Sequence, residues 1–385
     1  MQKRKILALL LCVLLMAASV PGALADGAAP ESGEKVAEMA AANSCGVSLY
    51  WSVNNSTLSI TGSGAMFDYS YGAAPWYSER WNISSVTLQE GMTSIGASAF
   101  AGCSQIRSIN IPATVTAIGA GAFDDCRNLE YISVASGNRA YQAVDGALLT
   151  ADGSTLLLVP ESRFGSYAVP NTVRNVEYSA FANCRYLTGV SLPSSVVSIS
   201  GDAFSGCSSL STISVAAGNS SYQAVDGALL TADGSALVYC PAGKSGDYTV
   251  PDTVREIQYS ALADCSRLSS VTIPSSVVSI GERAFSGCSS LTDVYYNGSE
   301  TQWKAVSVAA GNEPLLSARL HFDALLPEDL NGDGVISAQD AALLARYLKA
   351  RGLGVVLKGN GDLNGDGVIN GADLVRLARL LKQTS

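Results

Sequence analysis

Two short segments near the carboxyl end carry the oxygen-bearing side chains that a calcium ion needs. They read DLNGDGVISAQD (329–340) and DLNGDGVINGAD (362–373), begin 33 residues apart, and agree at nine of twelve positions. Calcium is a hard cation that takes about six to eight oxygen ligands, and a loop with alternate acidic or amide side chains supplies them. The sequence therefore predicts two calcium-binding loops.

Each loop position has a distinct task in this chemistry. Positions 1, 3 and 5 supply side-chain oxygens, position 7 a backbone carbonyl, position 9 a direct or water-mediated contact, and position 12 the last carboxylate. Position 6 must turn sharply, which explains Gly334 and Gly367. The last ligand is Asp, where an EF-hand loop usually has Glu. The predicted ligands are Asp329, Asn331, Asp333, Val335, Ser337 and Asp340 for one Ca²⁺ ion, and Asp362, Asn364, Asp366, Val368, Asn370 and Asp373 for a second.

An apolar face follows each loop, and this pattern predicts a helix. Leucines recur at helical spacing after both loops, for example Leu344 and Leu348 after the first and Leu377 and Leu381 after the second. No comparable helix precedes either loop, so each unit is half an EF-hand. Without an ion the carboxylates of a loop would repel one another, and we expect folding of this region to depend on calcium.

The duplicated loop and helix resemble a type I dockerin, the module that plugs proteins into the cohesin domains of a cellulosome scaffold. The resemblance covers 329–385 and implies a small all-α domain with a cohesin partner. A structural calcium site without a partner remains the alternative. The family's partner contacts lie at loop positions 10 and 11 and on the following helix, and fall here on Ala338, Gln339, Ala345, Arg346, Gly371, Ala372, Ala378 and Arg379. By this resemblance, the near-duplication implies docking in either of two orientations related by a half turn, and the matching arginines suit an acidic partner rim.

A repeat of a different kind fills the middle of the chain. Six cysteines lie at positions 103, 126, 184, 207, 265 and 288, with steps of 23 and 58 residues that recur every 81 residues. Each closes a phrase such as Ile95-Gly96…Ala99-Phe100…Cys103, and a short alternating segment such as Ile109–Ile111 follows. One strand and one turn cannot bury an apolar side alone, so stacked repeats are expected.

The phrase resembles the BspA-like leucine-rich repeats of bacteria, from Cys45 to Phe322. The resemblance implies an α/β solenoid with a parallel β-sheet on one side and short helical turns opposite. Leu262 replaces the usual Phe in one copy. A ladder of cysteines predicts free, packed thiols. Disulfide bonds are the alternative, because the oxidising environment of a secreted protein permits them.

The longer step holds an insert, present in two nearly identical copies. The thirteen residues Tyr141–Gly153 recur unchanged at Tyr222–Gly234. Asp-Gly between apolar runs is a strong hairpin signal, so we expect a strand, a tight turn and a returning strand that ends at Pro160 or Pro241.

The amino-terminal segment has the order of a secretory signal peptide. Lys3, Arg4 and Lys5 precede an apolar run that ends in Pro21-Gly22 and small residues. An uncleaved anchor is the alternative. Removal of those three basic residues lowers the net charge from −9 to −12, which disfavours nucleic acid as a partner. We expect a secreted, extracellular protein, associated with a cell surface or cellulosome, without a transmembrane segment after cleavage.

The predicted domain organisation has six parts. The cap before the repeats contains Trp51, Trp76 and Trp81, and Trp303 lies in the closing cap. The parts are a signal peptide (1–25), a leader (26–44), an N-terminal cap (45–90), the repeats with a C-terminal cap (91–322), a linker (323–328) and the dockerin (329–385).

Catalytic constellations are not evident in the sequence. The single histidine, His321, has no obvious partner, and no Gly-x-Ser-x-Gly or phosphate-binding glycine motif occurs. The outward strand positions, from Ser108 to Tyr295, form a polar and nearly uncharged surface. These patterns favour a non-catalytic binding or adhesion protein that recognises a protein or glycan. The alternative is a polysaccharide-degradation component or glycoside hydrolase accessory. A protein-ligand or inhibitor role toward proteases or host surfaces is a third possibility.

Overall fold

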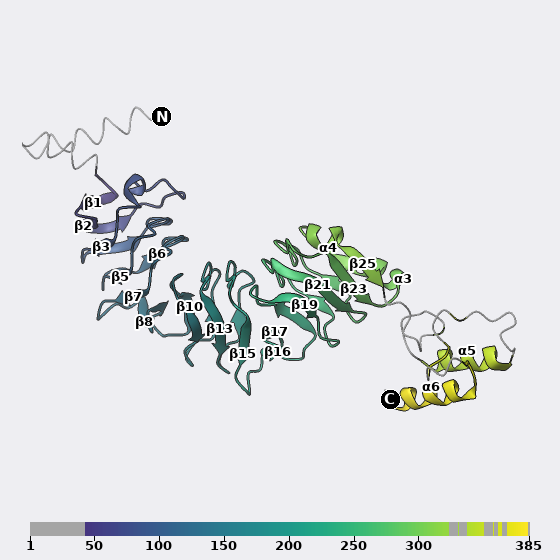
Figure 1. Cartoon of the computed structure of the whole chain (residues 1–385). Helices are drawn as coiled ribbons and strands as arrows, with labels where there is room; N and C mark the ends of the chain where they lie inside the picture. The colour runs from purple at the N-terminus through teal and green to yellow at the C-terminus, as the bar shows by residue number, and fades with distance from the viewer. Residues whose placement is uncertain are drawn as a thin grey trace, which may run out of the picture. The chain divides into compact units, whose positions relative to one another are not determined.

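The computed structural model describes residues 43–322, 330, 337–349, 357, 361–363 and 368–383. The predicted signal peptide and nearly all of the leader lie outside this range. In the described part, the chain is a solenoid of stacked coils made mostly of short strands, followed by two helices (Figure 1). The predicted fold class is confirmed.

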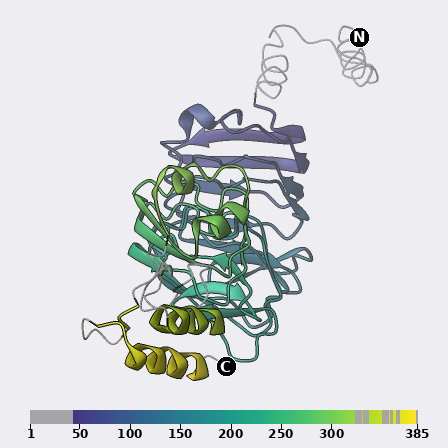
Figure 2. The same cartoon turned by 90° about the vertical axis from the view of Figure 1, so that its right-hand side faces the viewer.

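The solenoid begins with a hairpin that caps the first coil. Strands β1 (Gly46–Asn54) and β2 (Thr57–Met66) pair antiparallel, and β3 (Ser85–Leu88) and β4 (Met92–Ile95) then run parallel to β2. This hairpin is purple in Figure 2. Trp76 is buried beneath it against Trp51, Tyr69 and Phe100, whereas Trp81 is exposed. The cap thus covers the apolar end of the stack.

One side of the coils carries the longer parallel strands, in three sheets. The first holds β5 (Ser108–Ile111) and β7 (Tyr131–Val134), and the second holds β11 (Gly165–Ala168), β13 (Leu187–Leu192) and β15 (Thr212–Val215). The third holds β19 (Ser245–Thr249), β21 (Arg267–Pro274), β23 (Asp293–Asn297) and β25 (Arg319–Phe322). Alternate residues point into the core, as the alternating sequence predicts.

Two-residue strands form a second edge of the coils. They are β6 (Ala117–Ile118), β12 (Asn175–Val176), β14 (Ser198–Ile199), β20 (Glu256–Ile257), β22 (Ser279–Ile280) and β24 (Ser307–Val308). The Ala-Phe…Cys phrases form tight turns between the two edges. Their phenylalanines stack from coil to coil, with ring centroids 5.8 Å apart for Phe100 and Phe123 and 5.0 Å for Phe181 and Phe204.

The cysteine ladder lies in the core, as expected. Each described cysteine is a buried, free thiol. Successive thiols donate to the preceding coil, with 3.2 Å from Cys126 Sγ to the Phe100 carbonyl and 3.0 Å from Cys207 Sγ to the Phe181 carbonyl. Burial raises the pKa of Cys103 to about 12, so this thiol stays protonated and unreactive.

Each insert is a three-stranded meander, which differs from the predicted two strands. The first consists of β8 (Tyr141–Val144), β9 (Ala147–Thr150) and β10 (Thr155–Leu158), and the second of β16 (Tyr222–Val225), β17 (Ala228–Thr231) and β18 (Ala236–Tyr239). The second Asp-Gly of each copy also makes a turn, because the Asp152 carboxylate accepts bonds from Thr150 Oγ1 and the Ser154 amide.

Helices are confined to the ends of the described chain. The 3-10 turn η1 (Tyr77–Glu79) belongs to the first cap, and α3 (Glu300–Ala305) and α4 (Glu313–Ser317) close the solenoid. Ser299 and Gln302 form a reciprocal capping box at the start of α3. The last two helices are α5 (Ala338–Lys349) and α6 (Gly371–Gln383). No helix among the described residues is long and apolar enough to cross a membrane.

Candidate calcium-dependent docking module and sheet-face site

The helices α5 and α6 begin at the same position of the two predicted loops. Their inner leucines form one small core with the second residue of each loop, and the members Leu330, Leu344, Leu363 and Leu377 are all buried. Leu344 and Leu377 are equivalent in the duplication, as are Leu330 and Leu363. The duplicated sequence therefore builds a duplicated core.

The structure describes half of the predicted calcium ligands. Ser337, Asp340, Asp362, Val368, Asn370 and Asp373 are described, whereas Asp329, Asn331, Asp333, Val335, Asn364 and Asp366 lie outside the described residues. Among the described residues, no three His, Cys, Asp or Glu side chains lie close enough to hold a metal.

The last carboxylate of each loop lies in the same hydrogen-bond pattern. Asp340 and Asp373 are fully buried. Asp340 accepts bonds from the amides of Leu330 at 2.9 Å and Ser337 at 2.7 Å. Asp373 accepts bonds from the amides of Leu363 at 2.8 Å and Asn370 at 2.7 Å. The position-12 aspartate thereby ties the start of the loop to the start of the helix.

Position 9 caps each helix. Ser337 Oγ accepts a bond from the Gln339 amide at 3.1 Å, and Asn370 Oδ1 accepts one from the Ala372 amide at 2.7 Å. Burial of a carboxylate is costly unless hydrogen bonds and positive charge offset it. The described ligand positions offer hydroxyl, amide and carboxylate oxygens from Ser337, Asn370 and the aspartates. Oxygen donors of this kind fit a hard divalent cation, so the described residues are compatible with calcium.

The residues predicted to contact a partner are all exposed. They comprise Ala338, Gln339, Ala345 and Arg346 on α5 and Gly371, Ala372, Ala378 and Arg379 on α6. The loop-helix unit therefore presents the same set of positions twice.

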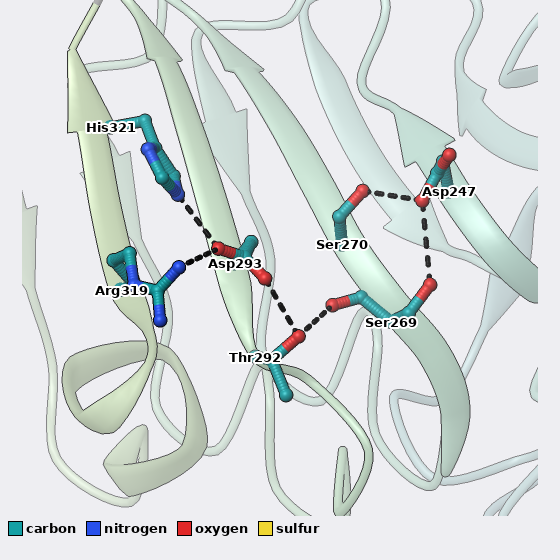
Figure 3. Close-up of polar contacts among 7 residues, drawn as sticks. All are labelled: Asp247, Ser269, Ser270, Thr292, Asp293, Arg319 and His321. Atoms are coloured by element: carbon teal, nitrogen blue, oxygen red, sulfur yellow. Dashed lines mark hydrogen bonds and ion pairs between the residues drawn. The ribbon is translucent and has the colours of Figure 1, made fainter.

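A second polar site lies on the third parallel sheet. Sequence alternation predicted the outward positions of Ser270, Thr272, Asp293 and Tyr295, but not those of Asp247, Arg319 and His321. Four strands bring Asp247, Ser270, Asp293 and Arg319 into one row across the sheet. The next outward row contains Thr272, Tyr295 and His321. Figure 3 shows the polar contacts of this sheet-face site.

Its hydrogen bonds form two groups around two carboxylates. Asp293 contacts His321 Nε2 at 2.7 Å and accepts a bond from Thr292 Oγ1 at 2.8 Å, and Arg319 lies 3.8 Å away. These contacts lower the pKa of Asp293, with the His321 bond the largest cause. Asp247 accepts bonds from Ser270 Oγ at 2.7 Å and Ser269 Oγ at 3.4 Å. Both carboxylates are thus held in fixed positions.

These charges correct the expectation of a nearly uncharged sheet face. Asp247, Arg319 and His321 lie on the outward side of the third sheet together with Asp293. His321 has a carboxylate partner and stacks on Tyr295, with ring centroids 4.6 Å apart and planes 14° apart. The register of four strands creates these contacts, and a single strand's sequence cannot show them.

A stacked-coil solenoid with a cysteine ladder, followed by a duplicated loop-helix module, defines a repeat protein with a docking module. The chain matches BspA type leucine rich repeat regions in six copies, at 75–143, 161–225 and 242–307, which is just over half of its length. It belongs to this family. Residues 327–382 match the dockerin type I domain. Both modules are non-catalytic, and dockerin domains of this type bind calcium and cohesins.

Solved structures of bacterial leucine-rich repeat proteins are similar to the chain. One from Eubacterium ventriosum is 24% identical, with a TM-score of 0.46, over 66% of this chain and 71% of that one. A leucine rich cell surface protein from Faecalibacterium prausnitzii is 30% identical, with a TM-score of 0.45, over 64% of this chain and 62% of that one. A search of curated proteins finds no match.

Proposed function

We propose that the chain is a secreted, non-catalytic binding protein that attaches to a cohesin-bearing scaffold and presents its solenoid to a ligand. The proposal includes the domain boundaries predicted from the sequence, among them a signal peptide at 1–25 and the dockerin at 329–385. One Ca²⁺ ion in each loop orders α5 and α6, with the two ligand sets predicted from the sequence. The matching bonds of Asp340 and Asp373 carry the proposal, because they close both loops identically.

The calcium ions would supply positive charge to the loop carboxylates. The protein's own residues position the loop ends and the helices. Asp340 and Asp373 fix the loop ends, and the leucine core fixes the helices against each other. The exposed Arg346 and Arg379 then offer two equivalent cationic contacts to an acidic cohesin rim. Either half can take the same place on the partner, since the two halves present equivalent residues.

Single arginine variants test the two-orientation docking. Arg346→Ala and Arg379→Ala should each weaken cohesin binding by about twofold, because one intact orientation remains, while the double variant should lose tenfold or more. Calorimetry of the full chain in calcium measures this. Arg376→Ala, an exposed α6 residue outside the predicted contacts, serves as the control. Unequal losses for the two single variants would contradict docking in both orientations.

The absence of catalysis is tested separately. The purified chain, incubated with a panel of polysaccharides, should release no reducing sugar. Release by the wild type would overturn the non-catalytic proposal without affecting the docking one.

A further inference from the structure

The 81-residue duplication offers a comparison of two sheet faces within one chain. Inward positions keep their type, as with Tyr167 and Tyr248, and Val190 and Val271, all of which are buried. Three outward positions change from a small polar residue in the second sheet to a charged or aromatic residue in the third. The three changes that matter are Ser166 to Asp247, Thr212 to Asp293 and Ser214 to Tyr295. Core packing does not require these changes, because they lie on the other side of the strands.

The changed residues surround a shallow hollow of about 450 Å³ on the third sheet. Ser270 and Thr272 of β21 lie between Asp247 of β19 and Tyr295 of β23. His321 covers one face of the Tyr295 ring from β25, on the side away from β21. Tyr295 is 43% exposed and lines the hollow. The hollow therefore has a hydroxyl-bearing floor, an aromatic wall and a carboxylate wall.

The charges around the hollow are largely compensated. The guanidinium of Arg319 lies 3.8 Å from the Asp293 carboxylate, which also has a hydrogen bond with His321 (Figure 3). Asp247 is held by two serine hydroxyls, and none of the ion pairs found within residues 43–322 includes it. A ligand thus meets one uncompensated carboxylate together with several hydroxyl groups. A strongly cationic ligand would favour more than one uncompensated carboxylate.

We propose that this hollow binds a neutral sugar unit of a glycan. Sugar hydroxyls donate to the Asp247 carboxylate and exchange bonds with Thr272 and Ser270, and the C–H face of the ring packs on Tyr295. The inference rests on the proposed binding role of the solenoid. Tyr295 supplies the aromatic contact, and Asp247 supplies the hydrogen-bond acceptor. Asp293 holds His321, which stacks on the Tyr295 ring and positions it.

Calorimetric titrations of the full chain in calcium test the proposal. The probes are cellopentaose, xylopentaose and mannopentaose, with tri-arginine as a cationic comparison. At least one pentasaccharide should bind, and Tyr295→Ala and Asp247→Ala should each weaken it about tenfold. The matched variants Ser214→Ala and Ser166→Ala, at the equivalent outward positions of the second sheet, should leave binding unchanged.

Each other outcome overturns the proposal. Binding of no pentasaccharide, equal binding by Tyr295→Ala, or tri-arginine binding that depends on Asp247 without sugar binding would each reject a glycan site here. A parallel cohesin titration with the same variants separates this failure from failure of the proposed function. If the variants still bind cohesin, the proposed docking stands even when the glycan site is rejected. If Tyr295→Ala still binds a different ligand of the solenoid, the proposed binding role stands as well.

Discussion

Glu161 shows how one residue distinguishes two copies of the 81-residue unit. Its equivalent in the second copy is Ala242. Glu161 is buried, and its carboxylate accepts a 2.8 Å bond from the Asp125 amide. Burial raises the pKa of Glu161 to about 7, and the nearby Asp125 and Asp124 carboxylates add to the rise. The folded chain therefore holds a proton on Glu161 that the unfolded chain releases at lower pH.

This difference predicts the pH dependence of stability. The stabilisation is complete below pH 4.5, the ordinary pKa of Glu161, and is lost as the pH rises to about 7. The free energy of unfolding should fall by about 1–3 kcal/mol across this interval. Urea unfolding of wild type and Glu161→Gln measures it, since Gln keeps the acceptor without titrating. A slope that persists in Glu161→Gln would assign the dependence to other groups.

Residue types predicted the calcium donors but not the sheet-face site. Loop ligands lie within twelve consecutive residues, so their spacing alone reveals them. Asp247, Asp293 and His321 lie on different strands, and only the strand register brings them together. A lone histidine in sequence gave no sign of its contact with Asp293 or its stacking on Tyr295.

At the scale of elements, the residue before each ladder cysteine decides whether the turn can close. It is in the left-handed region in all six repeats, as Gly102, Gly206 and Gly287 and as Asp125, Asn183 and Asp264. Glycine, Asn and Asp are the residues that adopt this conformation at low cost. The phrase therefore closes with one of these three residues before Cys.

Asn183 provides a test of that requirement. Its φ is 58°. Asn183→Ala should lower the free energy of unfolding by about 1 kcal/mol, because an ordinary side chain is strained there, while Asn183→Gly should change it by less than about 0.5 kcal/mol. Thermal or urea unfolding measures both variants. Equal destabilisation by Ala and Gly would point to a lost side-chain contact instead of backbone strain.

Elements were predictable where a local signal existed. Coil period, strand alternation and the first Asp-Gly turn of each insert follow from the sequence. The third strand of each insert was missed because Leu156 and Leu237 pair with strands on both sides, which local alternation does not reveal.

At the scale of the whole molecule, two repeats of different period serve two tasks. The 81-residue unit builds a surface, and the copy that forms the third sheet carries the charged and aromatic outward residues. The 33-residue unit builds a small helical module whose two halves present matching contacts. In the proposed function, calcium in this module allows the solenoid to attach to a scaffold.

A calorimetric titration of the full chain with candidate cohesins, in millimolar calcium and in excess EDTA, tests this attachment. We expect saturable binding to at least one cohesin in calcium and loss of that binding in EDTA. The double variant Asp340→Ala/Asp373→Ala should lose binding even in calcium, since both loop closures are removed. Binding of equal strength with and without calcium, or binding to none of the cohesins offered, would rule out calcium-dependent attachment to a scaffold.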